Sequence, residues 1–267
     1  MTKNIDLQQL TTQVCELART VGTYLKEEIN KLNSTEIESK GLHNFVTYID
    51  KASEKRLMAE LKKILPEAGF IAEESPGAKT SDRYNWVIDP LDGTTNYIHG
   101  LPVYSISIAL TEKEKVISGV VYEPNLDECF YAWKGSKAFL NKKVIEVSKS
   151  TTINDSLFAT GFPYHDYRKI EQYLDVFRFL MKNSHGLRRI GSAAIDLVYV
   201  ACGRFEGFYE YGLSPWDVAA GSFIVKQAGG KASDFSGGEN YIFGKEIVAT
   251  NDKVYNEFMQ LIKKYFA

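Results

Sequence analysis

The chain has few residues of the kinds that form disulfides or bind transition metals. Its three cysteines are isolated in the sequence and never paired as C-x-x-C. Cys15, Cys129 and Cys202 therefore fit reduced thiols better than a disulfide framework or a zinc site. The four histidines show no H-x-x-x-H spacing, which argues against a metal held by histidines. Disulfide-rich and zinc-dependent classes of protein are disfavoured.

Long apolar runs and concentrated charge are also missing. No apolar stretch approaches the roughly 20 residues that span a bilayer, and the opening MTKNIDLQQLTTQ is too polar for a secretory signal. The 32 basic and 34 acidic residues give a net charge of −2, and the basic residues form no stripe. We therefore expect a cytoplasmic protein without nucleic-acid or membrane partners.

What the chain does have is enough apolar sequence for a large core. Its 267 residues are 44% apolar, and we find no repeat, low-complexity tract or flexible linker. In the first half the spacing of apolar residues predicts two helices followed by a largely antiparallel sheet. The predicted helices cover about 10–25 and 50–65, and the strands cover 70–72, 86–88, 104–110, 116–122 and 129–133.

After residue 149 strands alternate with helices, which indicates an α/β layer. The predicted strands lie near 157–160, 187–190, 205–210 and 247–250, and the helices at about 167–182, 193–202, 214–229 and 252–265. We therefore expect an α+β half at residues 1–148 and an α/β half at 149–267, packed as one compact unit.

Acidic residues follow two of the predicted strands. FIAEES places Glu73 and Glu74 after the strand at 70–72, and WVIDPLDGTTN places Asp89 and Asp92 on a short loop after the next strand. If these strands are neighbours, the acids meet at one sheet edge. Carboxylates within about 4–6 Å of each other are unfavourable unless a cation lies between them. Oxygen ligands without His or Cys suit Mg²⁺ first, with Mn²⁺ as an alternative.

The residues around the second acid pair also suit phosphate. Pro90 restricts the backbone so that both aspartates could project toward one point, together with the carbonyl oxygen of Leu91. Gly93 allows a ligand to approach the main chain, and the sequence from Thr94 onward should open a helix whose free amides bind phosphate. We therefore predict metal on the aspartates and phosphate on the amides that follow.

Each of these motifs also has a purely structural interpretation. DPLDG is rich in turn residues and could be a solvated turn, and EES could cap a helix. PWDVAAG, which contains Asp217, could be an ordinary helix start with a proline and a capping acid. The presence of all three in one chain favours the functional interpretation.

The strings FIAEES, WVIDPLDGTTN and WDVAAG resemble, in this order and at comparable separations, the inositol monophosphatase family of Mg²⁺-dependent, lithium-sensitive sugar phosphatases. The resemblance covers nearly the whole chain, from FVTYID at 45–50 to QAGG at 227–230. It implies a layered α-β-α-β-α sandwich of the inositol monophosphatase and fructose 1,6-bisphosphatase type, with the active site between its halves. It also implies a homodimer, the common state of such relatives.

The resemblance implies roles for residues at matching positions. By this resemblance the acids would share two Mg²⁺ ions, and a third, weaker ion is compatible with the charge of a bound phosphomonoester. One ion would be held by Glu73, Asp89 and the carbonyl of Leu91, the other by Asp89, Asp92 and Asp217, with Glu74 as a supporting residue. Glu73, Asp92 and Thr94 would be catalytic, Gly93 and Thr94 would bind phosphate, and Asp92, Gly191, Ser192, Ala193 and Glu210 would contact the sugar hydroxyls.

One position departs from the family pattern D-x-V-T-x-x-D. The sequence NFVTYID has Asn44 where the first acid is expected, whereas Asp50 keeps the second. An amide can hold a water molecule but cannot take its proton, so the preparation of the attacking water is in question. Lys40 resembles a lysine that some members place near the phosphate, although it could equally be a solvated surface lysine.

Three functions fit the sequence. The first is Mg²⁺-dependent hydrolysis of inositol monophosphate, or a related small polyol phosphate, by direct attack of water. The second keeps this chemistry on fructose 1,6-bisphosphate, 3'-phosphoadenosine 5'-phosphate or the 2'-phosphate of NADP, where Arg188 or Arg189 could pair with a second phosphate. The third is a non-catalytic sensor of divalent cations or phosphorylated metabolites, a hypothesis that Asn44 alone favours.

Replacing Asn44 by aspartate tests the departure from the family pattern. We expect the natural protein to need more Mg²⁺ for full rate than Asn44→Asp, because the carboxylate would help to bind a third ion and to prepare the water. Phosphate release titrated with Mg²⁺ measures this, and equal Mg²⁺ dependence of the two proteins would refute it.

Overall fold

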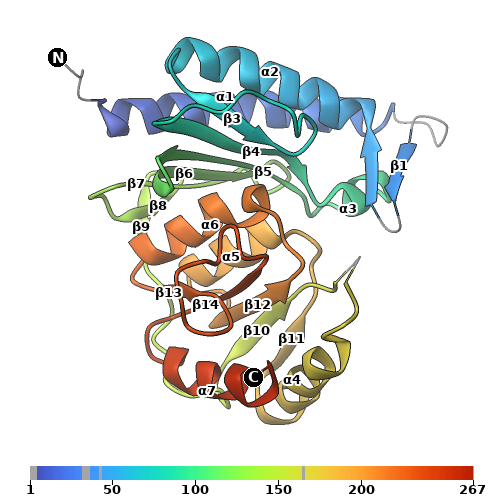
Figure 1. Cartoon of the computed structure of the whole chain (residues 1–267), viewed down its shortest axis with the longest axis vertical. Helices are drawn as coiled ribbons and strands as arrows, with labels where there is room; N and C mark the ends of the chain where they lie inside the picture. The colour runs from blue at the N-terminus through green and yellow to red at the C-terminus, as the bar shows by residue number, and fades with distance from the viewer. Residues whose placement is uncertain (1–4, 32–36, 42–43, 164–165, 267) are drawn as a thin grey trace.

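Helices and sheets alternate in five layers in the computed structural model, which describes residues 5–31, 37–41, 44–163 and 166–266. In Figure 1 a layer of helices lies over the large sheet, a second helix layer separates it from the smaller sheet, and a third covers the far side of the smaller sheet. The expected α-β-α-β-α sandwich is confirmed. The helix layers are α1 (Leu7–Glu28) with α2 (Tyr48–Ile64), α5 (Ala193–Ala201) with α6 (Pro215–Gln227), and α4 (Ile170–Asn183) with α7 (Tyr255–Phe266).

The larger sheet carries one end of the site. It has seven strands in sequence order, with β3 parallel to β4 and the remaining neighbours antiparallel. The two acid-bearing strands are therefore neighbours, which is the condition under which their acids were expected to meet. The strands are β3 (Gly69–Ala72), β4 (Tyr84–Asp92), β5 (Ser105–Glu112), β6 (Lys115–Glu123), β7 (Glu128–Trp133), β8 (Ala138–Leu140) and β9 (Lys143–Ile145).

The prediction that Asp89 and Asp92 lie on a loop is wrong. β4 continues through both residues, and its pairing with β5 shifts register between them, where Asp89 lies opposite Ser107 and Asp92 opposite Ser105. Pro90 has no N–H to donate to a neighbouring strand, and such a residue is tolerated at a bulge. The bulge thus places two acids on strand backbone, which is more rigid than a loop.

The smaller sheet is mixed and has the order β11-β10-β12-β14-β13. β10 is parallel to β11 and β12, and β14 is antiparallel to β12 and β13. Its strands are β10 (Leu157–Thr160), β11 (Gly186–Arg188), β12 (Gly207–Tyr211), β13 (Lys231–Ser233) and β14 (Glu246–Thr250). Outside the sandwich lie the hairpin of β1 (Ile37–Gly41) and β2 (Asn44–Thr47) and the short helix α3 (Thr94–Ile98).

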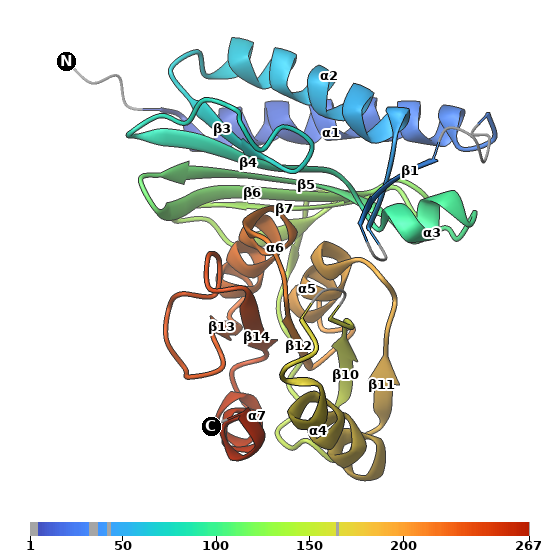
Figure 2. The same ribbon diagram turned by 45° about the vertical axis from the view of Figure 1, so that its right-hand side comes forward.

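Small residues allow α5 and α6 to fill the space between the two sheets, as Figure 2 shows. A Cβ atom on Gly221 of α6 would stand 2.6 Å from the Cβ of Leu197 on α5. One on Gly119 of β6 would stand 2.9 Å from the carbonyl oxygen of Ala220. The AAG of WDVAAG therefore serves close packing, and it fixes the start of α6 against the larger sheet.

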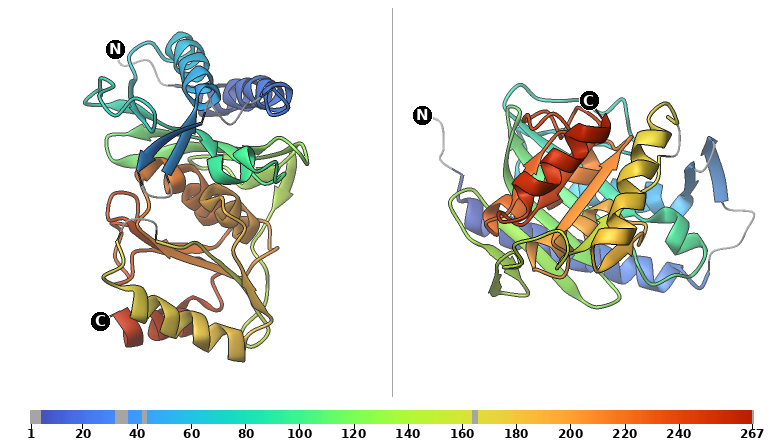
Figure 3. Two further views of the ribbon diagram at one scale, coloured as in Figure 1. Left: turned by 90° about the vertical axis from the view of Figure 1, so that its right-hand side faces the viewer. Right: turned by 90° about the horizontal axis from the view of Figure 1, so that it is seen from below.

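The outer helices bury one face each. α1 buries Leu10, Val14, Val21 and Leu25 against the larger sheet, and α7 covers the smaller sheet at the opposite end of the molecule (Figure 3). No helix in the part of the chain that the structure describes is both long and apolar enough to cross a membrane.

Candidate active site

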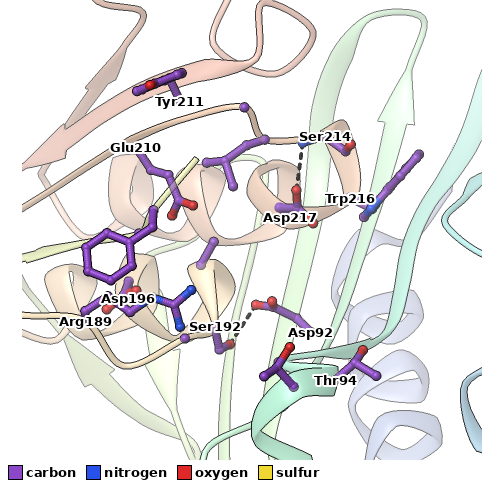
Figure 4. A pocket seen from close by; sticks show the side chains of 18 of the residues that line it. Asp92, Thr94, Arg189, Ser192, Asp196, Glu210, Tyr211, Ser214, Trp216 and Asp217 are labelled. Carbon is purple, nitrogen blue, oxygen red and sulfur yellow. Dashed lines mark hydrogen bonds between the residues drawn. The ribbon is translucent and has the colours of Figure 1, made fainter. Parts of the chain in front are cut away.

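A cavity of about 330 Å³ opens where the carboxyl end of β4 faces the N-terminal ends of α5 and α6 (Figure 4). This volume falls at the small end of the range for ligand pockets. Residues that are more than 100 positions apart in the sequence meet in its wall. The lining consists of Glu73, residues 92–95, Gly161, Phe162, Arg189, residues 191–193, Asp196, residues 210–214, Trp216 and Asp217.

Asp92 joins the two halves of the chain. Its Oδ2 accepts hydrogen bonds from Ser192 Oγ at 2.6 Å and from Ala194 N at 2.7 Å, in the first turn of α5. A carboxylate is favourable there because the amides at a helix start are partly positive. Ser192 Oγ also lies 3.3 Å from Ser105 Oγ on β5. These bonds hold one Asp92 oxygen in place and fix the position of α5 against β4.

Asp89 lies at the centre of a group of acids. It is 2% exposed, and its Oδ1 accepts a hydrogen bond from Leu91 N at 2.9 Å. Burial raises the pKa of Asp89 well above its usual range, and the charges of Glu73, Asp92 and Asp217 raise it further. Acids from β4, from the end of β3 and from the start of α6 are therefore near neighbours.

Asp217 is held at the start of α6. Its Oδ2 accepts a hydrogen bond from Ser214 N at 2.7 Å, in a capping box at the N-terminus of this helix. Burial raises the pKa of Asp217 well above normal, and the charges of Asp92 and Glu73 raise it further. The structural interpretation of PWD as a helix start is thus correct, and the same aspartate also belongs to the acid group.

The acids of this group lie near one another but do not have the arrangement of a complete metal coordination sphere. Within the described ranges, no three His, Cys, Asp or Glu side chains are arranged so that they could hold a metal ion. Like charges repel, and Asp89, Asp92 and Asp217 each have one oxygen bonded to a nearby N–H or hydroxyl. The assignment of Glu73, Asp89, Leu91, Asp92 and Asp217 as metal ligands therefore stays a prediction.

Thr94 is bonded to a buried acid of the first half. Asp50 is 1% exposed, and its Oδ2 accepts hydrogen bonds from the amide and the hydroxyl of Thr47 at 2.8 and 2.6 Å. The hydroxyl of Thr94 lies 3.1 Å from Asp50 Oδ1 and 3.0 Å from the carbonyl oxygen of Leu91. The side chains of Asn44 and Lys40 lie outside what the structure describes.

The turn after Asp92 requires glycine. Gly93 has φ +96°, and a Cβ atom there would stand 3.0 Å from the carbonyl oxygen of Val103 and 3.2 Å from that of Gly191. Asn96 donates from Nδ2 to Val103 O and Ile190 O at 2.8 and 2.7 Å. These contacts bring the start of α3 beside the turn that precedes α5.

The far wall contains the predicted sugar contacts. Gly191 has φ +90°, Ser192 caps α5 and Ala193 begins it. Glu210 is 7% exposed on β12, and its carboxylate lies where a side chain on residue 161 would be, so Gly161 makes room for it. Burial raises the pKa of Glu210 to about 8, with Asp92 raising it and Arg189 opposing the shift.

Several lining residues escaped the sequence-based assignment, among them Asp196, Phe162 and Arg189. Asp196 is 1% exposed, and burial raises its pKa well above normal. An acid inside the apolar run AAIDLVYVA was the available signal. Arg189 was noted only as a partner for a second phosphate. The neighbouring Arg188 is exposed and is not among the residues that line the cavity.

Glu74 has a supporting contact of its own, as its amide donates to Glu54 Oε2 at 2.7 Å. This bond ties the end of β3 to α2. Glu54 is only 2% exposed and was not singled out in the sequence. Its sequence neighbours in α2 gave no sign that it would reach the acid-bearing segment.

The charge of the cavity fits divalent cations. Its lining contains five acids and one basic residue, Arg189, among the described residues. A phosphomonoester would be repelled by this excess of negative charge, and the raised pKa values show that ionised acids are unfavourable here without compensation. Carboxylate and carbonyl oxygens are the donors that hard divalent ions prefer.

The chain is similar to known proteins over nearly its whole length. The sequence model described as the inositol monophosphatase family matches residues 6–265. "Nus factor SuhB" of Pseudomonas aeruginosa is 38% identical over 268 residues, 97% of each chain. "Inositol-1-monophosphatase" of Mesorhizobium japonicum is 35% identical over 256 residues, 96% of each chain. The crystal structure of extragenic suppressor protein suhB from Bartonella henselae has a TM-score of 0.90 at 36% identity, covering 97% of this chain and 99% of that chain.

The raised pKa of Glu210 makes the stability of the metal-free protein depend on pH. Between the usual value of 4.5 and about 8, the unfolded chain has released this proton while the folded chain retains it. Raising the pH from 5 to 8 therefore lowers the contribution of Glu210 to the free energy of unfolding. Urea denaturation in EDTA at both pH values should show a steeper loss of stability for the natural protein than for Glu210→Gln. Identical pH dependence in the two proteins would contradict this assignment.

Proposed function

Because the chain belongs to the inositol monophosphatase family, we propose that it is a Mg²⁺-dependent phosphatase that acts on inositol monophosphate or a related small polyol phosphate. The observation that carries the proposal is the gathering of Glu73, Asp89, Asp92 and Asp217 beside the glycine turn that begins α3. This arrangement can hold a phosphate group once cations offset the acids.

The donor set supports two Mg²⁺ ions, with a third bound together with substrate and Mn²⁺ as an alternative metal. Glu73, Asp89 and the carbonyl of Leu91 would hold one ion, and Asp89, Asp92 and Asp217 the other. When bound, such ions neutralise the phosphate charge and lower the pKa of a water molecule, so that a nucleophile is available at neutral pH.

The side chains of the protein itself would position the reactants. A Thr94 hydroxyl that donates to Asp50 keeps its oxygen lone pairs free to accept a hydrogen bond from the attacking water. The backbone at Gly93 lines the cavity and would contact the phosphate. Ser192 and Ala193 at the start of α5, with Glu210 opposite, would contact the hydroxyls of the substrate. No residue needs to become phosphorylated.

The alternative substrates use the same chemistry. Fructose 1,6-bisphosphate, 3'-phosphoadenosine 5'-phosphate and NADP remain alternatives because the acid group and the glycine turn recognise only the phosphate. A homodimer also remains a proposal, which rests on resemblance to the family.

A second candidate function comes from the name of the Pseudomonas aeruginosa relative, a Nus factor at 38% identity over 97% of both chains. A role in transcription would overturn the expectation that the protein has no nucleic-acid partner. Co-purification of the tagged chain with transcribing RNA polymerase would favour this role, whether or not the chain releases phosphate.

Phosphate release tests the leading proposal. We expect the purified protein to release phosphate from inositol 1-phosphate with Mg²⁺ and to lose this activity in EDTA. Asp92→Asn should lower kcat by about 100-fold or more, because it removes the negative charge of a carboxylate that would hold one of the metal ions. Asp252→Asn is the matched control, since Asp252 forms a surface ion pair with Lys253 and does not belong to the acid group. Equal phosphate release with EDTA and with Mg²⁺ would refute the proposal. Faster release from NADP or fructose 1,6-bisphosphate than from inositol 1-phosphate would keep the chemistry but identify that compound as the better substrate.

A further inference from the structure

Arg189 is the one basic side chain among the described residues that line the cavity. It follows β11 and precedes the turn at Gly191. Its Cζ lies 5.2 Å from the centre of the Phe162 ring. A Cβ atom on Gly191 would stand 2.7 Å from its Nη1. The guanidinium is thus confined by an aromatic ring and by a residue that must be glycine, and its position is defined by the fold.

The charge of Arg189 reaches three acids of the cavity. Burial raises the pKa values of Asp92, Asp196 and Glu210, and the charge of Arg189 opposes this rise at all three. In Figure 4 the guanidinium projects into the cavity between Asp196 and Ser192, on the side where Glu210 lies. A cationic donor and a carboxylate acceptor therefore face the same part of the cavity, away from Asp217.

Asp196 lies near Arg189 and Glu210, and its buried carboxyl group has little other stabilisation. Its Oδ1 is buried and accepts no hydrogen bond from the described residues. A buried carboxyl oxygen without a partner is unfavourable, and the nearby guanidinium offsets that cost. Asp196 in turn favours the position of Arg189 inside the cavity over an extended position in solvent.

The neighbouring arginine differs in every respect that matters here. Arg188 is exposed, and its Nη1 donates to the carbonyl oxygen of Leu187 at 3.0 Å. The two residues have the same chemistry, so they form a matched pair, one directed into the cavity and one outside its lining.

The surroundings of Arg189 favour a hydroxyl over a second phosphate. A phosphate at the guanidinium would also approach Asp196 and Glu210, two buried acids that Arg189 already faces, and these acids would repel the phosphate whenever they are ionised. A hydroxyl carries no net charge. A substrate hydroxyl can accept a hydrogen bond from Arg189, and the same hydroxyl or the adjacent one on a polyol ring can donate a hydrogen bond to Glu210.

We propose that Arg189 is a specificity-determining residue whose guanidinium donates to a hydroxyl oxygen on the organic part of the substrate, beside the carboxylate of Glu210. Asp196 is the positioning residue that keeps Arg189 in the cavity. The pair fits adjacent hydroxyls of a polyol and disfavours substrates with a second phosphate. This inference rests on the proposed phosphatase function and assigns the part of its substrate that the metal-binding acids do not contact.

The test compares two substrates that differ only in hydroxyls, inositol 1-phosphate and cyclohexyl phosphate. We expect Arg189→Gln to lower kcat/KM for inositol 1-phosphate by about 10-fold or more, the usual effect of losing a hydrogen bond from a charged group. Cyclohexyl phosphate should change by less than about 2-fold, since it has no hydroxyl to lose. Arg188→Gln should leave both values unchanged, and Asp196→Asn should lower the inositol-to-cyclohexyl ratio by a smaller factor.

The outcomes separate the inference from the function on which it rests. An equal loss on both substrates in folded Arg189→Gln, or a larger loss on fructose 1,6-bisphosphate than on inositol 1-phosphate, would overturn the inference alone. A natural protein that hydrolyses neither compound with Mg²⁺ would overturn the proposed function. If Arg189→Gln fails to fold, Arg189→Lys decides the question, because it keeps the charge but loses the planar fork. We then expect a drop in the same ratio, and an unchanged ratio would contradict the inference.

Discussion

The repulsion among buried acids is the constraint on which the rest of this structure depends. Asp89, Asp92 and Asp217 are brought together with Glu73. Burial raises the pKa values of all three aspartates, and the charges of neighbouring acids raise those of Asp89 and Asp217 further. A fold that was optimised only for stability would avoid this arrangement. Its presence is understandable if the fold is completed by divalent cations, and the cavity beside it then becomes suited to an anionic substrate.

The layers of the sandwich serve to hold these acids in place. β4 carries Asp89 and Asp92 on a bulged strand, and α6 packs closely against both β6 of the larger sheet and α5. The hydrogen bonds from Ser192 and Ala194 to Asp92 join the first half to the second at the site itself. Catalytic geometry and the packing between the halves are therefore coupled, and a change at this contact would affect both.

Much of this arrangement could be predicted from the sequence, and the exceptions have physical causes. The apolar spacing of α1 and the alternation after residue 149 gave most of the elements, but β8, β9 and β13 have three residues each, too few for a pattern. The motif DPLDG looks like a turn locally, yet its pairing with β5 makes it a bulged strand. The conformation of DPLDG thus depends on a tertiary contact that the local sequence does not reveal. The same holds for Asp196 and Arg189, because the sequence does not show which side of a short element faces the cavity.

The most direct test of the central claim is thermal unfolding of the natural protein and of Asp89→Asn, each measured in EDTA and in saturating Mg²⁺. The account predicts that Asp89→Asn melts higher than the natural protein in EDTA, by about 2–4 °C for each kcal/mol of repulsion relieved. It also predicts that Mg²⁺ raises the Tm of the natural protein far more than that of the variant. No effect of Mg²⁺ on the natural protein, or an equal rise in both, would contradict it.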